Sequence, residues 1–197
     1  LVQVEYSGIN FKDGLASTES GRIARIDPLI GGVDLAGKVV ESSNANFKVG
    51  SNVIGHGYDI GVAHHGGFSQ YARTQSSWLV PMPTGLDSRT AMMIGTAGYT
   101  AALSVDALER AGLKPGTGPV LVTGATGILG SHLMVMLLRK GRKVRALRRP
   151  NASIALWNRL VVYFGVTPEQ LNLLEWVEGD VLDIPSLEDA MHGCKHV

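Results

Sequence analysis

The chain has 197 residues, of which 45% are hydrophobic and 18% charged, and its formal net charge is +1. This composition is typical of a globular protein with one or two domains. Its basic residues are scattered and lack an aromatic platform, which argues against a nucleic-acid partner. No uninterrupted apolar run is long enough to span a membrane, and the opening residues carry no signal-peptide pattern. We therefore expect a soluble, cytoplasmic protein without a membrane partner.

The first 90 residues contain short β-rich runs separated by glycine and polar turns. This texture is typical of a small, barrel-like β domain. The first run starts at Leu1 with no earlier strand before it, so we expect a domain that is truncated at its start. Residues 91–117 follow as a connecting segment, whose apolar helix is expected to end near Gly112.

Residues 120–130 read Val-Leu-Val-Thr-Gly-Ala-Thr-Gly-Ile-Leu-Gly and form the most informative stretch of the chain. The aliphatic run predicts a buried strand of a parallel sheet, and a helix is predicted to begin near Ile128. Between them, Gly124 permits a tight turn, Gly127 lets a pyrophosphate approach the backbone, and Gly130 lets the helix pack closely on the sheet. The start of such a helix binds phosphate through its free N–H groups. The stretch therefore predicts a nucleotide site, against the alternative of an ordinary glycine-rich turn.

A second predicted strand, near residues 142–147, runs into Arg148 and Arg149. In a doubly wound fold this position meets the adenosine ribose, where an acid holds the 2′-hydroxyl of NAD and a cation accommodates the 2′-phosphate of NADP. The two arginines therefore favour NADPH over NADH as the cofactor. The alternative is that both only solvate the end of a strand, as surface arginines usually do.

Three segments of the second half follow a known pattern: residues 123–132 (Thr-Gly-Ala-Thr-Gly-Ile-Leu-Gly-Ser-His), 144–149 (Val-Arg-Ala-Leu-Arg-Arg) and 178–183 (Glu-Gly-Asp-Val-Leu-Asp). They resemble the first part of the extended short-chain dehydrogenases/reductases, the epimerase and dihydroflavonol-reductase group. Besides the glycines and arginines above, the resemblance implies cofactor contacts from Thr126, Ile128, Leu129, Asp180 and Val181.

Two observations limit what this resemblance implies. Asp180 also suits a helix N-cap or a turn, which stays the alternative for that residue. The family's Tyr-x-x-x-Lys motif is absent, because Tyr163 is followed four residues later by Thr167. The resemblance therefore implies a cofactor site and no short-chain catalytic residues.

Five segments of the first half occur in a fixed order: residues 6–14, 32–40, 47–55, 66–72 and 91–102. Together, residues 1–116 resemble the zinc-free medium-chain quinone oxidoreductases, most closely the acrylyl-CoA reductase type. The resemblance implies a GroES-like domain, dependence on NADPH, and a small-molecule substrate that is a quinone or an α,β-unsaturated thioester or carbonyl compound. It also implies that Asn10 and Asp13 lie beside the nicotinamide and the substrate.

In that setting the Asn10 amide can donate a hydrogen bond to a developing enolate oxygen, and Asp13 can order the network around it. Without the resemblance, Asn10 is better described as a buried turn residue and Asp13 as a helix cap. Thr96 and Thr100 are weaker candidates near the hinge between the domains, because a packing surface of small residues explains the same sequence.

The sequence also indicates that no metal is used. Its one cysteine, Cys194, cannot form a cysteine-rich zinc site. His64 and His65 are adjacent, and neighbouring residues of an extended segment point to opposite faces. We therefore expect these two histidines to be loop or substrate-mouth residues.

The two resemblances meet near residues 113–126, and we interpret the chain as a fusion. The predicted fold class is α/β: a GroES-like β-rich domain (1–90), a connecting helix segment (91–117) and a partial doubly wound parallel Rossmann sheet (118–197), truncated at its end. The leading hypothesis is an NADPH-dependent oxidoreductase that transfers a hydride to an activated double bond or a quinone. The alternatives are a non-catalytic NAD(P)-binding module and a chimeric fragment without a function. Exposed sheet edges would favour a homodimer.

Overall fold

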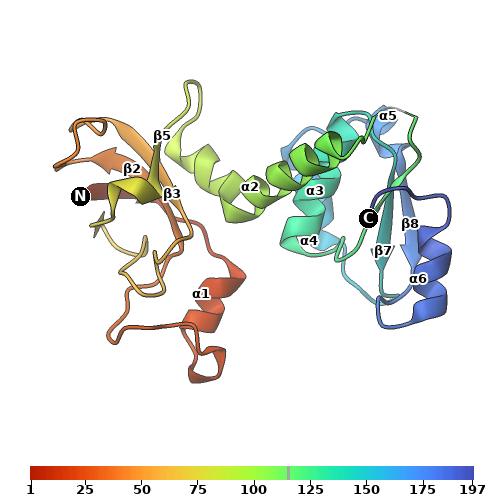
Figure 1. The fold of residues 1–197 in the computed structure, drawn as a ribbon, viewed down its shortest axis with the longest axis horizontal. Helices are drawn as coiled ribbons and strands as arrows, with labels where there is room; N and C mark the ends of the chain where they lie inside the picture. The colour runs from red at the N-terminus through yellow and green to blue at the C-terminus, as the bar shows by residue number, and fades with distance from the viewer. Residues whose placement is uncertain (115) are drawn as a thin grey trace. The chain divides into compact units, whose positions relative to one another are not determined.

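The computed structural model describes residues 1–114 and 116–197, which form two compact units, Leu1–Thr96 and Ala97–Val197 (Figure 1). The boundary falls inside helix α2 (Ser88–Arg110), next to Gly95, whose φ of 57° and ψ of −167° interrupt the helix. Only glycine adopts this backbone conformation at low cost. The boundary therefore lies within the segment predicted to connect the two domains. Pro115, in that segment and in the predicted junction, lies outside the described residues.

The first unit is built on a five-stranded antiparallel sheet in the order β4-β1-β2-β3-β5. Its strands are β1 (Val2–Tyr6), β2 (Asp34–Val39), β3 (Asn52–His56), β4 (Tyr71–Ala72) and β5 (Leu79–Pro81). The short helices of this unit are α1 (Phe11–Ala16) and the 3₁₀ turns η1 (Glu19–Gly21) and η2 (Ser76–Trp78). The predicted β-rich domain is confirmed.

The central strand β2 is buried on both faces, and this arrangement places an acid in the core. Side chains alternate along a strand, so Leu35 joins the apolar cluster on one face. Ala36 packs on the other face, against the start of α2. Asp34 shares the face of Ala36, since the two are two residues apart. In the antiparallel register Asp34 lies opposite His56.

The second unit is a three-stranded parallel sheet in the order β6-β7-β8. Its strands are β6 (Val120–Val122), β7 (Val144–Arg148) and β8 (Leu174–Glu178), and its helices after α2 are α3 (Ile128–Arg139), α4 (Ala155–Tyr163), α5 (Pro168–Leu171) and α6 (Ile184–Met191). The Leu121 N–H donates to the His196 carbonyl, 3.0 Å away, on the edge of β6 that faces away from β7. The chain thus enters the position beside β6 that the fourth strand of a doubly wound sheet occupies.

Helices cover both faces of this sheet. Val120, Val122, Val144 and Ala146 pack against α3 and Trp157 of α4. On the other face, Leu121 and Leu147 pack against Ala190 of α6. This two-sided burial explains the unbroken aliphatic runs of the strands, and it confirms the predicted α/β class with a partial Rossmann sheet.

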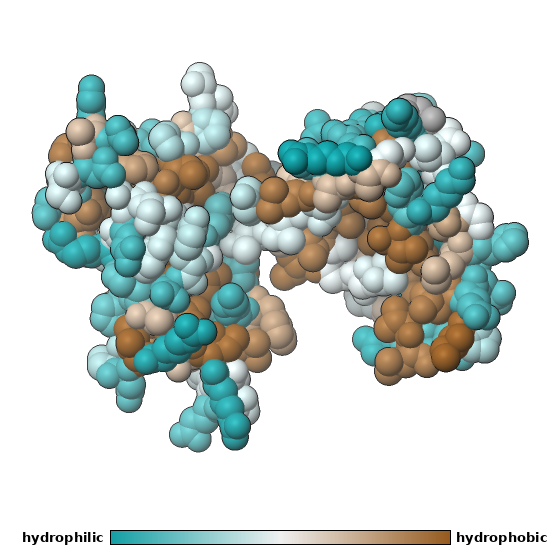
Figure 2. Space-filling model, in the orientation of Figure 1, coloured by the Kyte–Doolittle hydropathy of each residue, from teal (hydrophilic) through white to brown (hydrophobic). Residues whose placement is uncertain are grey.

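The end of the second unit where β8 runs into α6 carries apolar surface (Figure 2). Val181, Leu182 and Ile184 expose 50%, 88% and 67% of their surface there. These residues follow the carboxyl end of β8, at the edge of the sheet where the glycine turn after β6 also lies. Ligands of open α/β sheets bind at this edge.

Candidate active site and nucleotide site

The glycine turn after β6 has the geometry that a nucleotide site needs. Gly124 has a φ of +60°, and the Gly127 N–H donates to the Gly124 carbonyl at 2.9 Å. A Cβ on Gly130 would overlap that same carbonyl, so a side chain there would force α3 away from the turn. The structure therefore gives Gly124 and Gly130 the conformations and contacts expected from the sequence.

The start of α3 is suited to a phosphate group. Gly127 is the N-cap of the helix, and its own φ of −83° and ψ of 171° are extended. The N–H groups of the first turn, including those of Ile128, Leu129 and Gly130, have no acceptor within the helix. The positive end of the helix dipole lies at the same place. The residues present thus fit the pyrophosphate of a dinucleotide, and the individual contacts, that of Thr126 included, stay predictions.

Arg148 and Arg149 have different surroundings, which the sequence did not indicate. Arg148 donates from Nη2 to Glu178 Oε1 at 3.3 Å, and its guanidinium lies 5.6 Å from the centre of the Trp176 ring. Arg149 is exposed. Arg148 is thus already held by an acid at the end of β8, whereas Arg149 faces solvent. The role of both in binding a 2′-phosphate stays a prediction.

Asp180 forms the turn between β8 and α6. Its Oδ1 accepts from the Leu182 N–H at 3.0 Å, and its own N–H donates to Ser186 Oγ at 3.1 Å. This is the turn geometry that short acidic side chains favour. Asp180 therefore acts as a turn residue in the structure, which was the alternative given for it. Contacts of Asp180 and Val181 with a cofactor stay predictions.

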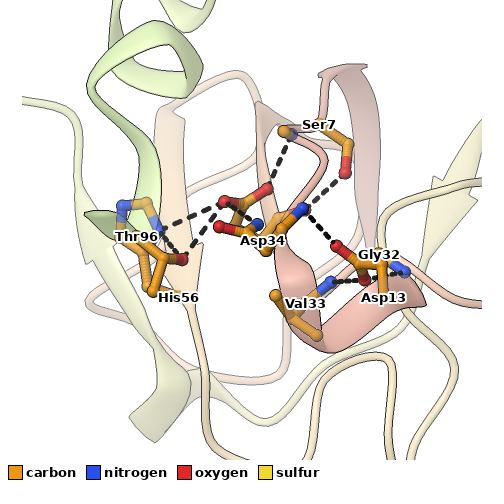
Figure 3. A network of polar contacts seen from close by, with 9 residues as sticks. Ser7, Asp13, Gly32, Val33, Asp34, His56 and Thr96 are labelled. Carbon is orange, nitrogen blue, oxygen red and sulfur yellow. Dashed lines mark hydrogen bonds and ion pairs between the residues drawn. The ribbon is translucent and has the colours of Figure 1, made fainter. Parts of the chain in front are cut away.

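In the first unit, Asp13 is a buried carboxylate that holds three backbone N–H groups. Its Oδ1 accepts from Gly32 and Val33 at 3.0 and 2.9 Å (Figure 3). Its Oδ2 accepts from the N–H of Asn10, the N-cap of α1, at 2.8 Å. Asp13 thus caps its own helix, which is the role expected for it without the family resemblance. It also connects that helix to the start of β2.

Asn10 is half-buried, and its side chain points to a second acid. The Asn10 Nδ2 group donates to Asp34 Oδ2 at 2.9 Å. The predicted pair Asn10 and Asp13 is therefore brought together, but the side chain of Asn10 contacts Asp34. The catalytic role of the pair stays a prediction.

Asp34 is the centre of the network, and it was not among the residues predicted from the sequence. Its side chain is 0% exposed. Its Oδ1 accepts from the Gly8 N–H at 2.6 Å, and its Oδ2 accepts from Thr96 Oγ1 at 3.2 Å as well as from Asn10. Its backbone carbonyl accepts from Ser7 Oγ at 2.7 Å. The available signal was an acid between apolar residues in the Gly-Val-Asp-Leu-Ala run, where a surface acid is not expected.

His56 completes the network across the sheet. Its Nδ1 lies 4.0 Å from Asp34 Oδ2 and 3.4 Å from Thr96 Oγ1 (Figure 3). Burial lowers the pKa of His56, and the nearby Asp34 carboxylate opposes that shift. Thr96, a weaker candidate from sequence, is thus part of the network.

The other two histidines considered from sequence make local contacts. The Ile30 N–H donates to His65 Nδ1 at 3.2 Å, and the His64 ring meets Trp78 edge-on at 5.4 Å between centres. Within residues 1–114 and 116–197, no group of three or more His, Cys, Asp or Glu side chains is placed to hold a metal ion. No helix in that described part of the chain combines the length and apolar character needed to cross a membrane.

Comparison with known proteins assigns the two halves separately. Residues 1–84 match the alcohol dehydrogenase GroES-like domain family, and residues 120–197 match the NAD dependent epimerase/dehydratase family. Each half of the chain is therefore similar to a different family. The resemblances drawn from sequence are thereby confirmed.

The relatives divide in the same way. The chain is 50% identical over 153 residues to acrylyl-CoA reductase AcuI of Ruegeria pomeroyi, covering 77% of the chain and 46% of that protein. It is 38% identical over 90 residues to dihydroflavonol 4-reductase of Zea mays, covering 46% of the chain and 24% of that protein. The chain thus spans less than half the length of the curated relatives it matches. A match of 153 residues must include β6 and α3, so it overlaps on the glycine turn with the epimerase/dehydratase match over residues 120–197.

Two solved structures support the fold. The Bacillus subtilis protein yhfP with NAD bound is 43% identical, with a TM-score of 0.78, over 90% of this chain and 50% of its own. The yhdH oxidoreductase of Salmonella enterica in complex with NADP is 43% identical, with a TM-score of 0.76, over 81% of this chain and 49% of its own. Each similarity covers more of the chain than residues 1–116 contain. The similarity to the medium-chain enzymes therefore continues past residue 116, which was the limit expected from sequence.

Proposed function

We propose that the chain is an NADPH-dependent oxidoreductase of the quinone or enoyl reductase type. Its substrate would be a small molecule with an activated double bond, such as an acrylyl-CoA-like thioester, or a quinone. The observation that carries the proposal is Asn10, whose side-chain amide donates to Asp34 and whose backbone N–H donates to Asp13, in the part of the chain that matches the alcohol dehydrogenase GroES-like domain family. The cytoplasmic location and the homodimer through sheet edges belong to the same proposal.

The glycine turn and the residues around it would hold the cofactor. The α3 N-terminus, beginning after Gly127, would bind the pyrophosphate. Arg149 is exposed and would take the 2′-phosphate. NADPH supplies a hydride when it is bound. NADP is favoured over NAD because β7 ends in Arg148 and is followed by Arg149, with no acid directly after it. One neighbour was solved with NAD and another with NADP.

Asn10 would stabilise the charge that develops on the substrate. A side-chain amide has two N–H donors, and one of those of Asn10 is directed at Asp34. The second can donate to the carbonyl oxygen of a substrate, where negative charge accumulates as the double bond is reduced. Asp13 would hold the backbone of Asn10 in place. We therefore assign Asn10 as a catalytic residue and Asp13 as a positioning residue.

The test combines binding with turnover. The purified chain is melted with increasing NADPH or NADH, and NADPH consumption is followed with acrylyl-CoA and with a quinone. We expect the melting temperature to rise more with NADPH than with NADH, and Arg149→Ala to weaken that preference. We also expect NADPH to be consumed in the presence of either substrate. Arg139→Ala, which removes an exposed cation in the last turn of α3, is the matched control.

Each other outcome counts against the proposal. Stabilisation by NADPH without turnover would replace it with a non-catalytic NAD(P)-binding module. A melt that neither nucleotide changes would indicate a chimeric fragment without a function of its own. Equal stabilisation by NADH and NADPH would contradict the assigned cofactor preference.

A further inference from the structure

Asp34 is a buried carboxylate surrounded by neutral donors. Its side chain has no exposed surface, and it accepts hydrogen bonds from the Gly8 N–H, Asn10 Nδ2 and Thr96 Oγ1. The one ion-pair contact that the described residues give it is His56, at 4.0 Å. Burying a charge in this way costs free energy, and a buried ionic group is a weak source of stability. The buried carboxylate is therefore better explained by the groups that it holds in place than by a contribution to stability.

The carboxylate fixes which way the Asn10 amide faces. An ionised carboxylate only accepts hydrogen bonds, whereas an amide carries a donor end and an acceptor end. The NH₂ end of Asn10 must therefore face Asp34, at 2.9 Å, and the carbonyl end is turned away. With one N–H held, the direction of the second N–H is set as well. A neutral partner such as an asparagine would accept either orientation.

The backbone N–H of Asn10 is held as well, and both the backbone and the side-chain interactions connect Asn10 to one short segment of the chain. Asp13 accepts from the Asn10 N–H and from the N–H groups of Gly32 and Val33. Asp34 follows these two residues directly in the chain. The backbone and the side chain of Asn10 are thus both tied to residues 32–34 at the start of β2.

The loop before Asn10 approaches the carboxylate so closely that a side chain at Gly8 would fit only tightly. A Cβ on Gly8 would lie 3.0 and 3.1 Å from the two Asp34 carboxylate oxygens. That is tighter than ordinary van der Waals contact, so either the loop or the carboxylate would have to move. Gly8→Ala therefore disturbs the Asp34 carboxylate without removing it.

We propose that Asp34 is a positioning residue that fixes the Asn10 amide so that its second N–H donates to the substrate oxygen. This inference rests on the proposed reductase function. Asp34 itself is 0% exposed, so it would act through Asn10 and not on the substrate directly.

The first test is solvent exchange of the Asn10 side-chain amide, measured by ¹H–¹⁵N NMR on the whole chain. Its resonances are assigned by their loss in Asn10→Ala, and the exposed Asn151 is the reference. We expect the Asn10 proton held by Asp34 to exchange at least about tenfold more slowly than those of Asn151. We expect both Asp34→Asn and Gly8→Ala to remove this difference. Because the wild-type comparison does not depend on Asp34→Asn, it decides the question even if that variant does not fold.

The second test is a double-mutant cycle on turnover. Asp34→Asn and Asn10→Ala should each lower kcat roughly a hundredfold, with little change in KM. The double variant should be no slower than Asn10→Ala alone, because both substitutions remove the same interaction. Asp106→Asn removes an exposed acid paired with Arg110 on α2 and should leave kcat and the melt unchanged.

The outcomes separate this inference from the proposed function. If the wild type turns over but the Asn10 amide exchanges fast, the role of Asp34 is overturned and the reductase function stands. The same conclusion follows if the losses of kcat in Asp34→Asn and Asn10→Ala multiply in the double variant. Slow exchange with no turnover in the wild type overturns the reductase function. A lowered melt with unchanged kcat in Asp34→Asn shows that Asp34 is only structural, and overturns the inference.

Discussion

Asp34 and His56 lie directly opposite each other on neighbouring antiparallel strands, with Asp34 Oδ2 4.0 Å from His56 Nδ1. Thr96 Oγ1 lies within 3.4 Å of the imidazole and 3.2 Å of the carboxylate. Strand register and the face covered by α2 thus bring three polar side chains together beside the apolar cluster that contains Ala36. The place of His56 in this network leads to a prediction about stability at low pH.

The first prediction concerns the unfolding free energy at low pH. Burial lowers the pKa of His56 in the folded chain, so the unfolded chain binds a proton at a higher pH than the folded one does. The stability contributed by the neutral imidazole is present above the ordinary histidine pKa and is lost as pH falls below it. Between about pH 7.5 and pH 5.5, the wild type should therefore lose more unfolding free energy than His56→Gln. Urea unfolding across that range measures the difference.

His192→Gln, which removes an exposed histidine of the second unit, is the control and should follow the wild type. Parallel stability curves for the wild type and His56→Gln would contradict the prediction. A wild type that gains stability relative to His56→Gln as pH falls would show that Asp34 raises the histidine pKa more than burial lowers it.

The second prediction concerns the glycine turn. Gly130→Ala places a Cβ on the Gly124 carbonyl, so α3 must move off the sheet. We expect a loss of about 1–3 kcal/mol in unfolding free energy, together with loss of the NADPH-dependent rise in melting temperature. Gly14→Ala is the contrast, since nothing lies within 4 Å of the added atom on α1. That variant should be neutral or gain up to about 1 kcal/mol, and equal effects of the two substitutions would refute the packing argument.

The second unit was largely predictable from sequence because its signals are local. Aliphatic runs, a glycine turn and a helical pattern follow one another along the chain, so the predicted strands agree with β6 and β7 to within two or three residues. Even the packing role of Gly130 could be stated, because turn geometry and helix entry are set within a few residues.

The polar network of the first unit was only half predictable. Asn10 and Asp13 are neighbours in sequence and were found together through a family pattern. Asp34 and His56 meet only because β2 and β3 pair in one particular register, which single-sequence patterns do not specify. The ion pair between Arg148 and Glu178 was missed for the same reason, since it joins β7 to β8 across the sheet.

The third prediction separates the backbone role of Asp13 from its charge. Asp13→Ala leaves the N–H groups of Asn10, Gly32 and Val33 without their acceptor, and we expect a cost of about 3 kcal/mol. Asp13→Asn keeps one carbonyl oxygen and should cost about 1 kcal/mol. Asp87→Ala removes an exposed carboxylate that accepts from the Thr90 N–H, and should cost about 1 kcal/mol as an ordinary cap. Urea unfolding ranks the three, and a cost for Asp13→Ala no larger than for Asp87→Ala would contradict the buried-acceptor role.

The last prediction concerns cofactor preference. Glu178 pairs with Arg148 across β7 and β8, so its negative charge lies beside the guanidinium that would join Arg149 at a 2′-phosphate. Glu178→Gln should free Arg148 and remove a repulsive charge, and we expect NADPH to bind severalfold more tightly while NADH changes little. The same sheet offers a matched control in Glu175→Gln, which breaks the equivalent pair with Arg145 farther from the carboxyl ends of the strands. Isothermal titration calorimetry measures the affinities of each variant for NADPH and NADH. An equal gain for NADH, or an equal effect of Glu175→Gln, would mean that Arg148 does not read the phosphate and that Arg149 alone is left for that role.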